Sequence, residues 1–246
     1  MTFTSSLQLG TLYGLSIGPG DPELITLKAL RLLKSAPIIA YPAGLNGQPG
    51  LAQKAISQWL SSNQTQVPLH FPYVQDPQAL KAAWSRAAET LLPFLQDGKD
   101  VAFACEGDVS LYSTFSYLAA AVKNSSKYIA ITTVPGITSS LAAAAQLGWP
   151  LTQQQQGLAI IPALYAQDNL QVLDAALGWA ETLVLLKINR AYPLIWNWLA
   201  RHNLLRYAAV VERATQPEQL IYQDLRDQQD LKLSYFSLLI VKRCGL

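Results

Sequence analysis

Charged residues are scarce in this sequence of 246 residues: Asp, Glu, Lys and Arg make up 14% of it, against about 25% in an average soluble protein. The hydrophobic fraction is 50%, so the composition excludes a disordered chain and favours a compact, enzyme-like protein with a sizeable core. The net charge is only +2, and the Lys and Arg residues are scattered. We therefore expect neither nucleic acid nor an anionic membrane as the main partner.

Cysteine and histidine are also rare, with two residues of each. Cys105 and Cys244 are far apart and form no CxxC or Cys/His pattern, which argues against a disulfide framework and against a metal site. His70 and His202 have no acid or cysteine at a telling spacing, so we interpret them as structural or exposed.

Long apolar runs are missing as well. No segment approaches about 18 uninterrupted apolar residues, and residues 1–18 lack a basic region followed by an apolar core. We expect no signal peptide and no membrane span. A reducing cytoplasm is the simplest setting for such a chain.

Apolar runs typical of buried strands alternate along the chain with runs of helical periodicity. The predicted strands cover residues 11–17, 36–42, 65–71, 100–105, 128–134, 158–164, 182–188, 207–212 and 235–243. Predicted helices cover residues 51–60, 76–96, 140–148, 169–180 and 192–202. Two more are predicted, one that begins at Pro22 and one that follows the loop of residues 106–114. This alternation predicts α/β architecture, and no repeat of solenoid length is present.

A short polar segment, KNSSK at residues 123–127, interrupts the apolar pattern and predicts a domain boundary. The predicted domains are an N-terminal α/β domain of residues 1–125 and a C-terminal α/β domain of residues 126–246. The segment TQQQQG at residues 152–157 is the alternative boundary.

Three loops between predicted strands and helices combine glycine with acids or hydroxyl groups. In the first, IGPGD, the glycines permit a close backbone approach or positive φ, and Asp21 can cap the helix that follows. It lacks the GxGxxG dinucleotide pattern and the Gly-Lys-Ser/Thr of a P-loop. In the second, ACEGDVSLYSTF, Asp108 either caps its helix or accepts hydrogen bonds from a ligand. In the third, TVPGITSS, three hydroxyl groups precede a helix. Each loop alone is compatible with a purely structural turn, but open α/β sheets bind ligands at loops of this kind.

The order of GPGDPELIT, EGDVSLYS, VPGITSS and VERATQPEQ resembles the tetrapyrrole methylase family, whose members transfer a methyl group from S-adenosylmethionine to a macrocycle. The resemblance extends from about Leu12 to Arg243. It implies two α/β domains with the active site in the cleft between them. Within the family, LYGLSIGPGDPELITLKA, VERATQPEQ and YFSLLIVKR are most similar to enzymes that methylate carbon 20 of precorrin-2, giving precorrin-3A, in cobalamin biosynthesis.

The resemblance also implies a set of residues that bind S-adenosylmethionine. They are Pro19, Gly107, Asp108, Val109, Thr138, Ser139, Lys187, Ala214, Thr215 and Ser237. Two positions depart from the family's pattern: Val109 replaces a common proline and so adds an N–H, and Ser16 replaces a frequent glycine, which affects local packing.

No metal is expected, and the sequence identifies no catalytic residue. A proton must leave the macrocycle after methylation, and Glu106, Tyr112, Glu212 or water can accept it.

The implied substrate carries many carboxylates, so cationic side chains should line its site. Lys54, Arg86 and Arg190 are candidates, with a solvated helix face as the alternative interpretation. We interpret the six tryptophans as packing residues. The family commonly pairs, so the resemblance implies a homodimer.

Several other functions stay open on the sequence alone. Within the fold, the alternatives are methylation of cobalt-factor II in the anaerobic pathway and methylation at another tetrapyrrole position. From other classes, the alternatives are a non-catalytic binding module and a methylase that acts on a protein side chain.

Overall fold

The computed structural model describes residues 8–44, 48–72, 76–163 and 170–243. Leu164 and Asn169, at the ends of two predicted elements, and Cys244 lie outside these residues. The chain forms two compact units, Met1–Thr138 and Ser139–Leu246, each with its own sheet. The predicted α/β class is confirmed.

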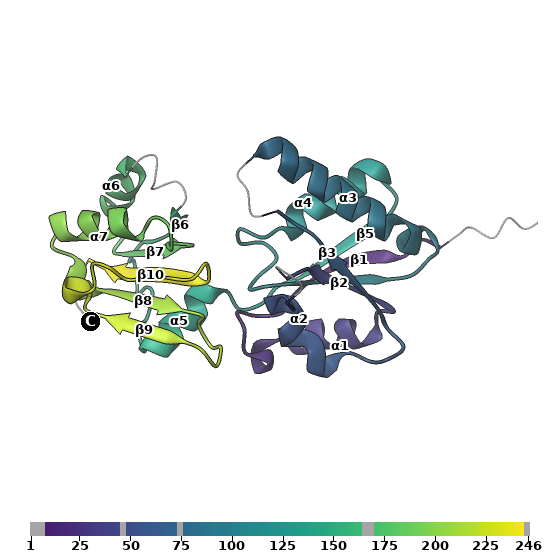
Figure 1. Ribbon diagram of the computed structural model, residues 1–246, viewed down its shortest axis with the longest axis horizontal. Coiled ribbons are helices and arrows are strands. Elements are labelled where there is room, and N and C mark those ends of the chain that lie inside the picture. Colours follow the sequence, from purple (N-terminus) through teal and green to yellow (C-terminus); the bar gives the residue numbers. More distant parts are fainter. Residues whose placement is uncertain (1–7, 45–47, 73–75, 164–169, 244–246) are drawn as a thin grey trace, which may run out of the picture. The chain divides into compact units, whose positions relative to one another are not determined.

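The first unit contains a five-stranded sheet of order β3-β2-β4-β1-β5, in which all paired strands are parallel (Figure 1). Its strands are β1 (Thr11–Ser16), β2 (Ile38–Pro42), β3 (Thr65–Leu69), β4 (Val101–Cys105) and β5 (Ala130–Val134). Side chains alternate between the two faces, as the period of two in a strand requires. In β4, for example, Phe103 packs into one hydrophobic cluster, and Ala102 and Ala104 pack into another.

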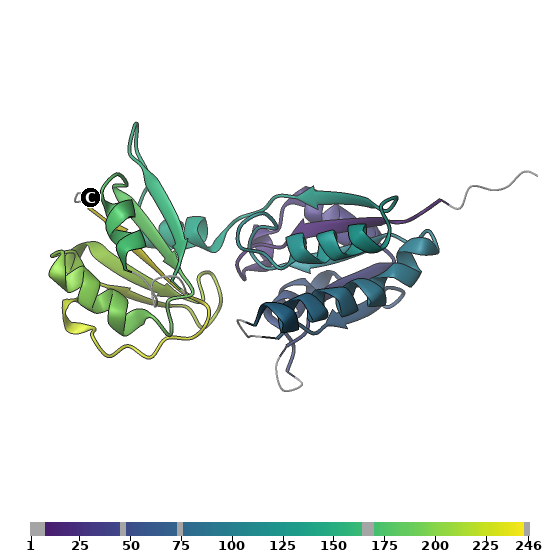
Figure 2. The same ribbon diagram turned by 90° about the horizontal axis from the view of Figure 1, so that it is seen from above.

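Helices cover both faces of this sheet (Figures 1 and 2). They are α1 (Leu27–Ser35), α2 (Leu51–Ile56), α3 (Pro77–Gln96) and α4 (Phe115–Ser125). Leu33 of α1 and Ile56 of α2 belong to one cluster, whereas Leu91 of α3 and Leu118 of α4 belong to the cluster on the opposite face. The inner strands β2 and β4 are therefore buried on both sides, which explains their nearly continuous apolar sequences.

The second unit contains a five-stranded mixed sheet of order β6-β7-β10-β8-β9. Its strands are β6 (Leu158–Pro162), β7 (Thr182–Leu186), β8 (Ala208–Glu212), β9 (Leu220–Gln223) and β10 (Ser237–Lys242). β10 lies between β7 and β8 and is antiparallel to both. The helices α6 (Gln171–Leu177) and α7 (Tyr192–Arg201) pack with the core cluster on one face, and α5 (Ser139–Leu147) packs against β10.

The unit boundary differs from the predicted one between residues 125 and 126. Lys123 and Ser125 belong to the last turn of α4, and β5 pairs in register with β1, so the chain up to Thr138 belongs to the first unit. The sequence pattern identifies β5 as a strand but carries no information about which sheet it joins.

Two further details of the predicted elements differ. The helix predicted from Pro22 is a short 3₁₀ turn, Pro22–Leu24, followed by α1, which starts after the capping residue Thr26. β9 was not predicted, because its mostly exposed residues show no apolar alternation.

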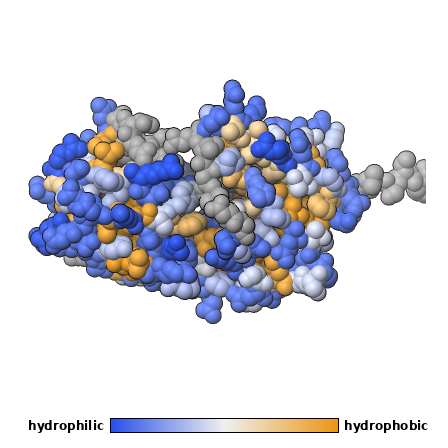
Figure 3. Space-filling model, viewed as in Figure 1, coloured by the Kyte–Doolittle hydropathy of each residue, from blue (hydrophilic) through white to orange (hydrophobic). Residues whose placement is uncertain are grey.

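Polar side chains cover most of the face shown in Figure 3, and apolar residues form scattered patches. Among the described residues, no helix combines the length and the apolar character needed to cross a bilayer.

Candidate functional site

Three loops follow the neighbouring strands β4, β1 and β5 of the first unit, and all leave the carboxyl edge of the sheet because the strands are parallel. The helix after β1, α1, packs on one face, and the helix after β4, α4, packs on the other. Adjacent strands whose connections depart to opposite faces define the switch point at which open α/β sheets bind ligands. The three glycine-containing loops predicted from the sequence meet here.

The first two loops are joined directly by their backbones. Gly107 N donates to Gly18 O at 2.8 Å, and Gly18 N donates to Gly107 O at 3.3 Å. Both glycines have positive φ, +79° at Gly18 and +67° at Gly107, a conformation that other residues rarely adopt. Pro19 is buried beside this bridge, and the carboxylate of Asp21 accepts from Glu23 N at 2.8 Å, which confirms its predicted capping role.

Gly107 also faces open space: a side chain added there would meet no atom within 4 Å. A bound molecule can therefore approach the loop backbone closely at this position. The position thus fits the nucleoside-containing cofactor that the sequence implies.

Asp108 joins the second loop to the third. Its Oδ2 accepts from Gly136 N at 2.7 Å, and its Oδ1 accepts from Ser110 N at 2.8 Å and from the Ser110 hydroxyl. Burial alone would raise the pKa of this carboxyl, but the hydrogen bonds from Ser110, Gly136 and Ser16 outweigh burial and hold the pKa below its usual range.

The structure does not place Asp108 at a helix terminus. Helix α4 starts at Phe115, seven residues later, so the interpretation of Asp108 as the cap of that helix is wrong. The intervening residues form turns and bends within the loop of residues 106–114. The carboxylate instead holds the loop backbone together.

Ser16, Ser110 and Gly136 were not among the predicted site residues. The Ser16 hydroxyl lies 2.7 Å from Val134 O and 3.0 Å from Val109 N, so it contacts all three loop regions. A side chain at Gly136 would place its Cβ 2.4 Å from Ser16 Cβ, so only glycine fits there. The sequence signal is a serine at the end of a buried strand, next to a glycine-rich turn.

Four of the five predicted residues of the second unit lie at one edge of its sheet. Lys187 follows β7, Ala214 and Thr215 follow β8, and Ser237 starts β10, which lies between these two strands. Lys187 and Thr215 have positive φ, at +58° and +65°. Non-glycine residues in this strained conformation are concentrated at functional sites.

Side-chain contacts stabilise this edge of the second sheet. Ser237 Oγ donates to Ser234 O at 2.8 Å, and Ser234 N donates to the buried Glu212 carboxylate at 2.6 Å. Lys187 Nζ lies 5.7 Å from the ring centroid of Tyr235, a cation–π geometry. Thr138 ends the first unit, and Ser139 begins α5, as the sequence predicts for hydroxyl groups at a helix start.

The residues proposed for proton transfer come from different elements of the chain. Glu106 Oε1 accepts from Ala52 N, at the start of α2, at 3.2 Å. Tyr112 has a φ of +50° and is 48% exposed, whereas Glu212 lies in β8. Their arrangement does not select one of them.

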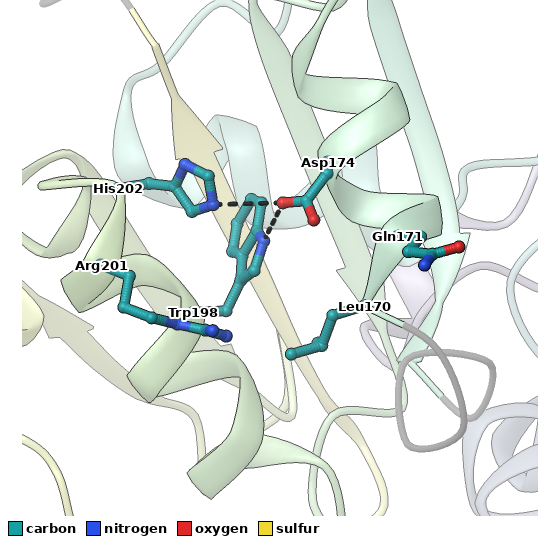
Figure 4. A pocket seen from close by; sticks show the side chains of 6 residues that line it. All are labelled: Leu170, Gln171, Asp174, Trp198, Arg201 and His202. Atoms are coloured by element: carbon teal, nitrogen blue, oxygen red, sulfur yellow. Dashed lines mark hydrogen bonds and ion pairs between the residues drawn. The ribbon is translucent and has the colours of Figure 1, made fainter.

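The second unit also holds a pocket of about 220 Å³ between α6 and α7 (Figure 4). His202 Nε2 lies 3.1 Å from Asp174 Oδ1, and Trp198 Nε1 donates to the same oxygen at 2.7 Å. His202 thus has a carboxylate partner that sequence spacing did not reveal. The pocket contains none of the predicted cofactor residues, and these contacts support a structural role for His202.

No group of three His, Cys, Asp or Glu side chains within the described ranges has the arrangement of a metal site. Cys105 is a buried thiol, and burial raises its pKa to about 12. Lys54, Arg86 and Arg190 are all exposed.

Comparisons with known proteins found relatives of this chain. The profile of the family described as Tetrapyrrole (Corrin/Porphyrin) Methylases matches residues 11–228. The chain is 35% identical to a cobalt-precorrin-2 C(20)-methyltransferase from Salmonella typhimurium, over 95% of this chain and 97% of that protein. It is 30% identical to a precorrin-2 C(20)-methyltransferase from Sinorhizobium, over 96% and 97% of the respective chains.

The fold is also similar to that of solved structures. The structure of a uroporphyrin-III C-methyltransferase from Thermus thermophilus, complexed with S-adenyl homocysteine, has a TM-score of 0.64 and 21% identity. The match covers 95% of this chain and 97% of that chain.

Proposed function

Because this chain belongs to the tetrapyrrole methylase family, we propose that it transfers a methyl group from S-adenosylmethionine to carbon 20 of precorrin-2, giving precorrin-3A in cobalamin biosynthesis. The observation that carries this proposal is the similarity, over almost the whole chain, to two enzymes named for methylation at carbon 20. The protein is thus an S-adenosylmethionine-dependent C-methyltransferase.

We assign cofactor binding to residues of both units, as the resemblance to the family implies. In the first unit they are Pro19, Gly107, Asp108, Val109 and Thr138, and in the second they are Ser139, Lys187, Ala214, Thr215 and Ser237. The switch point of the first sheet and the strained strand ends of the second support this assignment.

When bound, S-adenosylmethionine supplies an activated methyl group on a sulfonium. The bond between the methyl carbon and sulfur would break as the bond to carbon 20 formed, S-adenosylhomocysteine would leave, and a proton would then leave carbon 20. The loops contribute by binding and orientation, because holding the reacting atoms about 3 to 3.5 Å apart and aligned lowers the barrier by several kcal/mol. Glu106, Tyr112, Glu212 or water accepts the proton.

The carboxylates of the substrate require cationic partners. Exposed Lys54, Arg86 and Arg190 are the candidates. Substitution of each by Ala should raise the KM for the tetrapyrrole and leave the KM for S-adenosylmethionine unchanged if that residue binds the substrate.

The test is to incubate the protein with precorrin-2 and S-adenosylmethionine carrying a ¹³C-labelled methyl group, and to locate the new methyl by NMR. We expect the label on carbon 20 and one equivalent of S-adenosylhomocysteine. A methyl group at another carbon would refute the assignment, and tetrapyrrole binding without turnover would indicate a non-catalytic binding module.

A second candidate substrate is the cobalt-loaded form. The relative from Salmonella typhimurium is named for cobalt-precorrin-2, and its 35% identity favours this candidate. Parallel assays with equal concentrations of the metal-free and the cobalt-loaded tetrapyrrole decide between them by the ratio of kcat/KM values.

We further propose that the enzyme works in the cytoplasm as a homodimer. Leu220 and Ile221 on the edge strand β9 are 48% and 36% exposed, and an apolar edge of this kind favours self-association. The buried thiol of Cys105 suits a reducing compartment. Light scattering after size exclusion tests the dimer directly.

A further inference from the structure

The buried hydroxyl of Ser16 is the starting point. Ser16 is the last residue of β1 and is fully buried, so its polar group requires hydrogen-bond partners within the protein. A serine hydroxyl can donate once and accept twice. The oxygen lies 2.7 Å from Val134 O, 3.3 Å from Asp108 Oδ2 and 3.0 Å from Val109 N, so it donates to the carbonyl, with the carboxylate as a second and more distant acceptor, and accepts from the N–H.

These bonds continue the sheet beyond its last backbone pairs. The register of β1 with β4 ends at Ser16 and Cys105, and that of β1 with β5 ends at Leu15 and Val134. Past this point the backbone bridge between Gly18 and Gly107 still joins the first two loops, but no further strand pairing holds Val109. The Ser16 hydroxyl therefore spans the end of β5 and the loop after β4.

Val109 depends on this hydroxyl. It is 4% exposed, and its N–H donates to Ser16 Oγ. A buried N–H that loses its acceptor pulls the local backbone toward another partner or toward water. The segment that would move includes Gly107 and Asp108, both assigned to the cofactor site.

We propose that Ser16 is a positioning residue for the cofactor: its hydroxyl, by accepting from Val109 N, fixes the backbone of residues 107–109 in the conformation that binds S-adenosylmethionine. Ser16 acts through the loop and makes no contact with the cofactor itself. The inference rests on the proposed function, because it takes the loop to be part of the cofactor site.

A double-mutant cycle with Val109→Pro tests the coupling. The carbonyl of Asp108 accepts from Leu111 N at 3.4 Å, which places Val109 at the second position of a turn, where proline is favoured. The substitution removes the N–H and is expected to leave the turn in place. In that background residue 109 has no N–H that could donate a hydrogen bond to the Ser16 hydroxyl.

The measured quantity is the Kd of S-adenosylhomocysteine, by calorimetry, for the wild type, Ser16→Ala, Val109→Pro and the double variant. We expect Ser16→Ala to raise the Kd about tenfold in the wild-type background, which corresponds to about 1.4 kcal/mol, and less than about threefold in the Val109→Pro background. The KM for S-adenosylmethionine should rise in parallel, with kcat changed less. Hydrogen exchange at the Val109 amide should accelerate in Ser16→Ala.

Thr182→Val is the matched control. The Thr182 hydroxyl is equally buried, and it has no hydrogen-bond partner among the described residues. Its removal should leave the Kd unchanged.

Two results would overturn the inference. One is an equal rise of the Kd on Ser16→Ala in both backgrounds, and the other is a lowered melting temperature with an unchanged Kd, which is the signature of a purely structural serine. If Ser16→Ala does not fold, Ser16→Gly, which also removes the hydroxyl, takes its place in the cycle with the same two refuting results. Failure of the wild type to bind S-adenosylhomocysteine would instead refute the proposed function.

Discussion

Substitution of Asp108 by Asn tests whether the charge of this carboxylate holds the loops together. Gly136 N donates to Oδ2 and Ser110 N donates to Oδ1, so the two backbone donors use different oxygens. An asparagine keeps one acceptor and presents an NH₂ donor on the other side. Whichever way the amide is turned, one N–H faces another donor.

The expected loss follows from these contacts. A hydrogen bond to a charged group contributes about 1.5 to 3 kcal/mol, and Asp108→Asn removes one such bond and takes the charge from the other. We expect the free energy of unfolding at pH 7 to fall by about 2 to 4 kcal/mol. Urea unfolding followed by tryptophan fluorescence measures the difference from the wild type.

The difference should depend on pH. The pKa of Asp108 in the folded protein lies below its usual value, because the hydrogen bonds from Ser110, Gly136 and Ser16 outweigh the opposing effect of burial. The stabilisation is therefore complete above the unfolded-state pKa of about 3.9, and it is lost as the pH falls through the folded-state pKa. The gap between wild type and variant should be equal at pH 7 and pH 5 and smaller at pH 3.

Asp76→Asn is the control. The Asp76 carboxylate also accepts from a backbone N–H two residues later, that of Gln78, but it is exposed at the start of α3, where Asn caps equally well. A gap for Asp108→Asn below about 0.5 kcal/mol at pH 7, or one that does not shrink at pH 3, would refute the reasoning.

Two further predictions concern the buried interior of the first unit. Burial raises the pKa of the Cys105 thiol to about 12, so only about one thiol in 10⁴ is ionised at pH 8. In the Cys244→Ser variant, iodoacetamide should therefore not label Cys105 in the native protein but should label it in urea. Peptide mass spectrometry measures the labelling. A Cβ at Gly14 would lie 2.4 Å from the Phe115 ring, so Gly14→Ala should lower the free energy of unfolding by about 1 to 3 kcal/mol, and Phe115→Leu should restore part of the loss. Equal labelling rates in native protein and urea would contradict the first prediction. A Gly14→Ala variant as stable as the wild type would contradict the second.

The sequence predicted most elements of the fold because their burial follows from local patterns. The apolar run of β4 and the leucine spacing of α1 each identify their element without knowledge of its neighbours. Strand pairing is not local. The sequence therefore could not show that β5 joins the first sheet, which moves the boundary from residue 125 to Thr138, and it missed the exposed edge strand β9.

For the candidate site, too, the sequence predicted the local segments but not the contacts between them. The three loops were recognised from glycine, proline and acidic residues, and the first two of them pair through Gly18 and Gly107. The partners of the loop residues were not predictable, because Ser16 and Val134 are 118 positions apart in the sequence. Of the two roles that the sequence left open for Asp108, helix capping was wrong, and its contact with Gly136 was not predictable because Gly136 follows another strand.

The place of β10 has a consequence for synthesis on the ribosome. β10 is the central strand of the second sheet, yet residues 237–242 are translated after all four of its companions. Until they emerge, β6 with β7 and β8 with β9 are separate two-stranded ribbons with unpaired inner edges, which are marginally stable and prone to wrong association. The nascent second unit thus stays vulnerable to proteases and in need of chaperones until its last strand is made, whereas all five strands of the first sheet have already been translated by residue 134.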